Sequence, residues 1–236
     1  ERLLDLLSEL AQRLQLPLAI HLAETMEEVT YIRDGTGPIL ERLLRVKGGR
    51  GNSSPSSRGS TPVEFLARHG LLTPSTLAIH AVHVGEGDLE LLASHGVSIA
   101  HCPRSNHFLQ VGTAPLLAYL AKGMKVGLGT DSLASNESLS LWDEMRFAFA
   151  LHGGRVSAER LLRMATLGGA EALGFAKEIG SLEPGKRADL VAVRLHGFCS
   201  TGPAAGNRDL YQFLVFNIGP EDVILTMVDG KILYED

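Results

Sequence analysis

The sequence predicts an α/β protein with a parallel sheet covered by helices, followed by a small β-unit. Four short apolar runs alternate with helix-like stretches between residues 16 and 173. Each run is continuously apolar, which is typical of strands buried on both faces of a parallel sheet. After residue 178 apolar and polar residues alternate instead, which favours antiparallel strands. We therefore expect two domains, residues 1–178 and 179–236.

The apolar runs and the helical periodicity locate the expected elements. Strands are predicted at Leu16–Leu22, Thr76–Ala81, Val97–His101 and Val126–Thr130. Helices are predicted at residues 1–14, 26–33, 62–69, 88–95, 114–122, 139–152 and 158–173. Strands are also expected within Arg187–Leu195 and Asp222–Tyr234, with a hairpin turn at Asp229-Gly230. The Gly- and Ser-rich insert Lys47–Ser60 is predicted to be a flexible surface loop.

Composition excludes several classes of protein. The chain has 236 residues, of which 44% are hydrophobic and 21% charged, as in ordinary globular proteins. A net charge of −5 argues against nucleic acid or an anionic membrane as partner. Cys102 and Cys199 make no disulfide framework, and no signal peptide or membrane-length apolar run is visible. A cytoplasmic protein with a small-molecule partner is expected.

Polar residues stand at the carboxyl ends of four successive predicted strands, namely His21, His80, His101 and Asp131. In parallel α/β barrels the active site lies at this face. One such residue is most often a hydrogen-bonded core group, but four in succession favour a shared site. Glu24 follows His21 by three residues, which allows both side chains to enter one pocket. Glu24 could also cap the next helix near its N-terminus, and the two roles are compatible.

These residue types indicate hydrolytic chemistry. Imidazoles and a carboxylate suit a divalent metal such as zinc, which lowers the pKa of a bound water to about 7. Asp131 would accept the proton of that water, and Glu24 would protonate the leaving group. His80 would polarise the substituent on the attacked carbon.

Five segments carry a family resemblance: residues 21–25 (His-Leu-Ala-Glu-Thr), 78–83 (Ala-Ile-His-Ala-Val-His), 101–106 (His-Cys-Pro-Arg-Ser-Asn), 128–136 (Leu-Gly-Thr-Asp-Ser-Leu-Ala-Ser-Asn) and 180–191. They resemble the amidohydrolase superfamily. Within it they are most similar to the aminohydrolase branch, which contains guanine, S-adenosylhomocysteine/methylthioadenosine and aminodeoxyfutalosine deaminases and the triazine chlorohydrolases.

The resemblance implies the second half of a (β/α)8 barrel, strands five to eight, followed by part of a small β-sandwich. It implies one divalent metal, with zinc expected and iron the alternative. His21 and Asp131 would bind this metal, and His80 would contact the substrate or water and in some members approaches the metal. Glu24 would shuttle protons, and Ser135 would touch the substrate. Asn106 is a candidate substrate contact, although a loop-structuring role is favoured for it and for His101.

The chain departs from the family in one respect: the His-x-His pair on the first barrel strand is absent. We therefore expect this chain to be the C-terminal part of a longer enzyme, and the isolated chain to bind metal weakly without turnover. The expected activity is deamination of an amino-purine, an adenosine-type nucleoside or a related heterocycle. The alternatives are a chlorohydrolase or amidase of the same superfamily, or a non-catalytic fragment. Association into homodimers is a further expectation.

Overall fold

The computed structural model describes residues 2–46, 59–196 and 207–236. Cys199 and residues 47–58 of the predicted surface loop lie outside them. The chain divides into two compact units. The first unit comprises Glu1–His101 and Leu109–Met124, and the second comprises Cys102–Phe108 and Lys125–Asp236. The predicted domain division at residue 178 stays a prediction.

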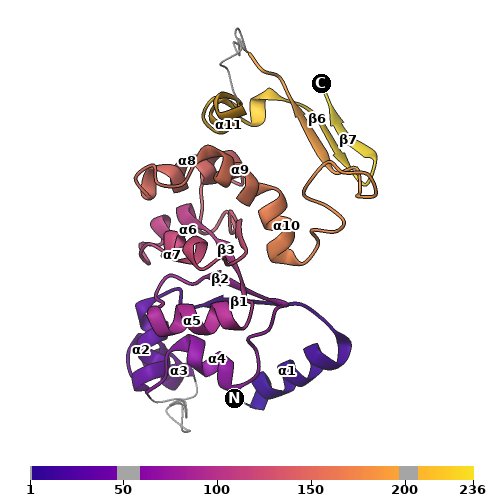
Figure 1. Cartoon of the computed structure of the whole chain (residues 1–236). Helices are drawn as coiled ribbons and strands as arrows, with labels where there is room; N and C mark the ends of the chain where they lie inside the picture. Colours follow the sequence, from indigo (N-terminus) through magenta and orange to yellow (C-terminus); the bar gives the residue numbers. More distant parts are fainter. Residues whose placement is uncertain (1, 47–58, 197–206) are drawn as a thin grey trace. The chain divides into compact units, whose positions relative to one another are not determined.

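The first unit contains a parallel sheet in which β2 lies between β1 and β3 (Figure 1). The strands are β1 (Leu18–Leu22), β2 (Thr76–His80) and β3 (Ser98–His101). The register pairs Leu22 with His80, so that β1 and β2 end at the same level. The sequence prediction of an α/β fold with a parallel sheet is confirmed. The finer prediction, half of a barrel plus part of a sandwich, stays a prediction.

Helices accompany these strands in the first unit (Figure 1). They are α1 (Arg2–Leu14), α2 (Met26–Asp34), α3 (Pro38–Val46), α4 (Pro62–Arg68), α5 (Glu86–Ser94) and α7 (Leu116–Ala121). A capping box at Thr61 and Glu64, with Pro62 in the first turn, explains where α4 begins. Leu22, Leu92 and Ile99 are at most 1% exposed, and each buried side chain of this size contributes about 1.5–3 kcal/mol.

Helix α1 presents its leucines outward in the described structure. Leu3, Leu7 and Leu14, which recur along one side of the helix, are exposed, whereas Ser8 and Ala11 are buried. The Ser8 hydroxyl donates a hydrogen bond of 3.0 Å to the Gly70 carbonyl. Periodicity therefore identified the helix, but the face that it buries is the one with small side chains.

The second unit begins with α6 (Pro103–Phe108) and the short strand β4 (Val126–Leu128). Three further helices follow, namely α8 (Leu141–Leu151), α9 (Ala158–Ala165) and α10 (Leu167–Leu173). Its remaining elements are β5 (Leu190–Val193), α11 (Asn207–Phe216), a 3-10 turn (Pro220–Asp222), β6 (Val223–Val228) and β7 (Lys231–Glu235).

The prediction of one helix over Ala158–Leu173 is wrong, because the helix breaks at Thr166 (φ −126°, ψ −104°). The break lets the start of α10 approach β4 closely. A Cβ atom on Gly168 would lie 3.0 Å from the Val126 carbonyl oxygen, and one on Gly127 would lie 2.9 Å from the Gly169 Cα. Only glycines permit this backbone contact.

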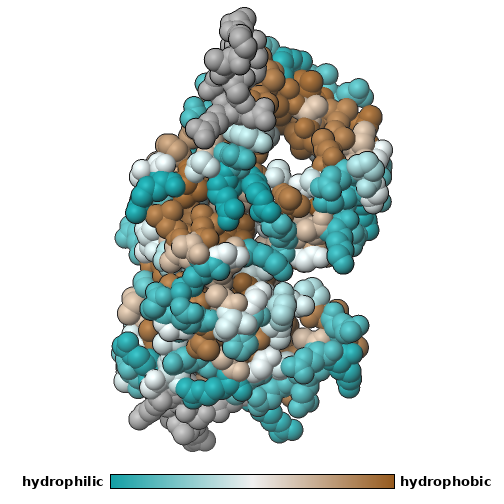
Figure 2. All heavy atoms as spheres, viewed as in Figure 1, coloured by the Kyte–Doolittle hydropathy of each residue, from teal (hydrophilic) through white to brown (hydrophobic). Residues whose placement is uncertain are grey.

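The predicted hairpin at Asp229-Gly230 is confirmed. These two residues have φ values of 50° and 76° and join β6 to β7 in an antiparallel sheet of order β5-β6-β7. Exposed apolar residues of this sheet include Val191, Ile232 and Leu233, and Figure 2 shows brown, hydrophobic atoms gathered over it. Among the described residues, no helix is both long and apolar enough to cross a membrane.

Candidate active site

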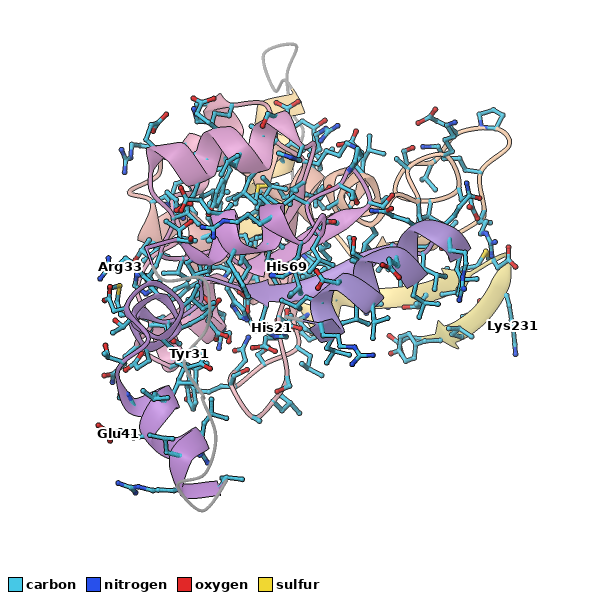
Figure 3. The ribbon with its side chains drawn as sticks, turned by 90° about the horizontal axis from the view of Figure 1, so that it is seen from below. His21, Tyr31, Arg33, Glu41, His69 and Lys231 are labelled. Carbon is cyan, nitrogen blue, oxygen red and sulfur yellow. The ribbon has the colours of Figure 1, made fainter. Side chains whose placement is uncertain are left out.

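The ends of β1 and β2 bring two predicted site residues together. His21 is the penultimate residue of β1 and is exposed (Figure 3), whereas His80 is the last residue of β2 and is fully buried. Their ring centroids lie 5.1 Å apart, with a tilt of 36° between the rings. Parallel pairing of the two strands produces this proximity, as the sequence predicted.

The backbone at both strand ends adopts the left-handed region. Ala23, His80 and Ala81 have φ values of 48°, 69° and 45°. This conformation costs roughly 1–2 kcal/mol per residue other than glycine, so surrounding contacts must hold it. The Ala81 amide donates to the Leu22 carbonyl at 3.0 Å, and the amide of Val82 donates to the Ala23 carbonyl at 3.0 Å. The two strand ends thus stabilise each other's conformation.

Glu24 faces His80 and does not cap the following helix. Its Oε1 lies 3.7 Å from the His80 Nε2. The N-cap of α2 is Thr25, whose hydroxyl accepts a hydrogen bond from the Glu28 amide at 3.1 Å. Glu28 in turn accepts hydrogen bonds from the Ala23 and Glu24 amides at 2.8 and 2.9 Å. Glu28 therefore accepts the hydrogen bonds of the backbone amides in this turn, and the Glu24 side chain is directed toward His80.

The sequence analysis missed Glu28, although Thr25 and Glu28 have the spacing of a capping box. Burial is the main reason that the pKa of Glu28 is raised, and the backbone amides that it accepts from oppose the rise. The carboxylate is thus a structural anchor for the turn that carries Glu24.

Tyr119 supports the end of β2 from α7. Its fully buried hydroxyl donates a hydrogen bond to the carbonyl of Ala81, the residue that follows His80. Burial, with a smaller contribution from Asp88, raises the pKa of Tyr119, so this phenol remains a donor across the ordinary pH range. Nothing in the local sequence predicts this contact, because 38 residues separate its partners.

Removing this hydroxyl tests its contribution. We expect Tyr119→Phe to lower the free energy of unfolding by about 1–3 kcal/mol, because the buried Ala81 carbonyl loses its donor. Urea unfolding followed by circular dichroism measures the change. Tyr234→Phe is the matched control, because Tyr234 is 50% exposed. Equal midpoints for both variants would show that the buried hydrogen bond contributes nothing.

Asp131 lies in the second unit, three residues after the end of β4, with φ 58°. Its Oδ2 accepts hydrogen bonds from the Ser105 and Ser135 hydroxyls at 2.7 and 2.6 Å. Its Oδ1 accepts one from the Ser132 amide at 2.8 Å. Three donors fix the orientation of this side chain. Ser105, which the sequence analysis missed, reaches Asp131 from α6.

The positions of Ser135, Asn106 and His101 do not by themselves indicate a role in catalysis. Ser135 is buried and bonded to Asp131. Asn106 is buried in α6, and its backbone amide donates to the Cys102 carbonyl at 3.0 Å. His101 ends β3 and is fully buried. Substrate contact by Ser135 or Asn106 therefore stays a prediction.

The structure thus groups the site residues within each unit. His21, Glu24 and His80 lie together in the first unit, and Asp131 lies with Ser135 in the second. In the part of the chain that the structure describes, no group of three or more His, Cys, Asp or Glu side chains could hold a metal ion. The chemistry of the donors fits zinc, which accepts imidazole nitrogens and carboxylate oxygens. Metal binding by His21 and Asp131, with His80 as a possible further ligand, stays a prediction.

Comparison with known proteins identifies the family. The model of the amidohydrolase family matches residues 1–233. A 5-methylthioadenosine/S-adenosylhomocysteine deaminase from Pelotomaculum thermopropionicum is 38% identical over 237 residues, covering 96% of this chain and 48% of the relative. The chain therefore spans about half the length of the curated relatives that it matches.

Two solved structures share the fold. An adenosine deaminase from Xanthomonas campestris with bound zinc has a TM-score of 0.78 and 32% identity, covering 98% of this chain and 48% of its own. Atrazine chlorohydrolase from Arthrobacter aurescens, complexed with zinc, has a TM-score of 0.77 and 28% identity, covering 99% of this chain and 47% of its own. The chain belongs to the amidohydrolase family.

Proposed function

We propose that this chain carries half of the active site of a zinc-dependent hydrolytic deaminase acting on an adenosine-type nucleoside. The observation that carries the proposal is the cluster of His21, His80 and Glu24 at the paired ends of β1 and β2. The similarity to a deaminase of methylthioadenosine and S-adenosylhomocysteine supports this substrate class. Hydrolysis would replace the exocyclic amino group of the purine by a carbonyl oxygen and release ammonia.

Two carboxylates of the chain, Asp131 and Glu24, would carry out the proton transfers. When bound, the metal supplies the Lewis acidity that makes a water molecule nucleophilic near neutral pH. His21 and Asp131 would hold this metal. The Asp131 carboxylate, oriented by three donors, would accept a proton of the attacking water. Glu24 would deliver protons to the ring nitrogen and to departing ammonia, and His80 would contact the substrate or the water.

Chlorohydrolysis is the second candidate, supported by the 28% identity to atrazine chlorohydrolase. It uses the same attack by water but expels chloride, which needs no proton from a general acid. Glu24 beside His80 favours deamination, because the amino substituent must gain a proton before it can leave as ammonia.

A chimera provides the direct test. The portion of the Pelotomaculum relative that lies outside the match would be fused to this chain, purified with zinc and compared with the chain alone. We expect the chimera to release ammonia from methylthioadenosine or S-adenosylhomocysteine, and the chain alone to show no turnover because its sequence holds no His-x-His pair. Adenosine, guanine and atrazine complete the substrate panel.

Three other outcomes of this experiment would each contradict part of the proposal. Chloride release from atrazine without ammonia release from any purine would replace deamination by the second candidate. A folded, zinc-loaded chimera that transforms none of these substrates would contradict a catalytic role for this chain. Turnover by the chain alone would contradict the division of the site between two halves.

A further inference from the structure

A fully buried carboxylate, Glu144 on α8, joins the two segments that hold Asp131 in the second unit. Its Oε1 accepts a hydrogen bond of 2.7 Å from the Asn136 side-chain amide. Its Oε2 accepts one of 3.2 Å from the backbone amide of Arg104 on α6. One side chain therefore anchors both the loop after β4 and the first turn of α6.

The first segment reaches Asp131 through Asn136. The Asn136 Nδ2 also donates to the Thr130 carbonyl at 2.7 Å, and Thr130 directly precedes Asp131. The Asn136 Oδ1 accepts from the Glu137 amide at 2.8 Å and from the Arg104 Nε at 3.2 Å. With donors on its oxygen and acceptors on its nitrogen, this side-chain amide has only one satisfactory orientation.

The second segment reaches Asp131 through α6. Glu144 holds the amide of Arg104, and the next residue, Ser105, donates its hydroxyl to the Asp131 Oδ2 at 2.7 Å. The two connections therefore converge on one carboxylate from different directions. Both run through intermediate residues, so the effect of Glu144 on Asp131 is transmitted by Asn136 and by the start of α6.

The charge of Glu144 is balanced only in part. The Arg104 Nε lies 3.8 Å from the Glu144 Oε1, while the same guanidinium lies 3.7 Å from Asp143 and 4.0 Å from Glu137. Burying a carboxylate is costly unless its oxygens are hydrogen-bonded. A well-packed apolar side chain would be cheaper if α8 needed only a core residue here. The carboxylate is better explained by the two connections that it makes.

We propose that Glu144 is a positioning residue for Asp131. By holding the Asn136 amide and the start of α6, it fixes the donors that orient the Asp131 carboxylate. This inference rests on the proposed function, because it gives Asp131 the role of the base. Glu144 lies on α8, 13 positions after Asp131 in the sequence, yet it would help to set the orientation that Asp131 needs as the base.

Amide hydrogen exchange on this chain tests the positioning without any activity measurement, at a pH above the Glu144 pKa of about 7, where both of its oxygens accept hydrogen bonds. Glu144→Gln keeps the shape, but its amino group would face one of two donors, so one connection is lost. We expect exchange of the Ser132 and Ser135 amides to accelerate about tenfold or more. Amides within α9, such as that of Leu161, should keep their rates. Glu159→Gln, at an exposed position of α9, is the matched control and should change neither set.

A second variant gives a rescue test. Asn136→Asp combined with Glu144→Gln reverses the polarity of the hydrogen bond between these two side chains. The Thr130 carbonyl loses its donor whenever Asn136→Asp is present, so the double variant restores only the bond between positions 136 and 144. The double variant should therefore exchange more slowly at Ser132 than the sum of the two single changes predicts. Unchanged exchange at Ser132 in Glu144→Gln would overturn the inference. Equal acceleration at every amide would also overturn it, because it would reveal only a loss of global stability.

The zinc-loaded chimera supplies the catalytic readout. Glu144→Gln should lower kcat about tenfold or more while KM stays within about twofold, since Asp131 acts on the water and not on ground-state binding. Faster exchange with unchanged kcat would overturn the inference. A parent chimera without activity would refute the proposed function, while the exchange experiment would still decide whether Glu144 orders the Asp131 loop.

Discussion

Asp131→Asn is expected to reduce turnover by the chimera by about 10²–10⁴-fold, measured as ammonia released from methylthioadenosine. The amide cannot accept a proton from the attacking water. It also places an amino group toward the Ser105 and Ser135 hydroxyls or toward the Ser132 amide, all of which now donate to the carboxylate. The orientation of the side chain is therefore lost together with its basicity.

The control for this prediction is Asp34→Asn, because Asp34 is an exposed residue whose described partner is the neighbouring Arg33. It should leave turnover unchanged. Ser105→Ala and Ser135→Ala separate orientation from basicity, and each should lower kcat less than Asp131→Asn does. Retention of full activity by Asp131→Asn would assign proton abstraction to another group.

The stability of the chain is expected to fall as pH rises from about 4.5 to about 7, through the titration of Glu144. Burial raises the pKa of Glu144 to about 7 from the ordinary value of 4.5, although Asn136 and Arg104 favour its charged form. In this window the folded protein holds a proton that the unfolded chain releases. The difference corresponds to about 3 kcal/mol, present below the unfolded pKa and lost above the folded one.

Urea unfolding at several pH values measures this effect. Glu28, whose pKa is also raised, contributes in the same direction, so the parent chain alone does not isolate Glu144. The difference between the parent and Glu144→Gln does isolate it, and this difference should change with pH across the window. Parallel curves for the two proteins would show that Glu144 does not titrate there.

Local patterning was enough to predict much of the fold. Continuous apolar runs located all four strands of the α/β part to within about two residues, because burial on both faces selects such runs. Periodicity could not show the break at Thr166, which depends on the approach of Gly168 to β4. Helix α3 was not predicted either: the sequence analysis assigned no element to this segment.

The candidate site was predicted where position in a strand decides proximity. His21 and His80 meet because parallel strands end together. The residues that hold the site were not predicted, since Tyr119, Ser105 and Glu144 act across 26 to 40 residues of sequence. Only Glu28 left a local signal, in its spacing from Thr25.

The left-handed backbone at residues 23, 80, 81 and 131 restricts how this protein could be engineered. A β-branched side chain or proline at these positions would meet steric strain before any effect on chemistry arose. A combinatorial library built to change substrate preference should therefore keep the native residues at these four positions, and place its diversity in neighbouring residues with ordinary backbone angles. Libraries that sample all residue types there would contain many variants destabilised by this strain, which costs roughly 1–2 kcal/mol per residue.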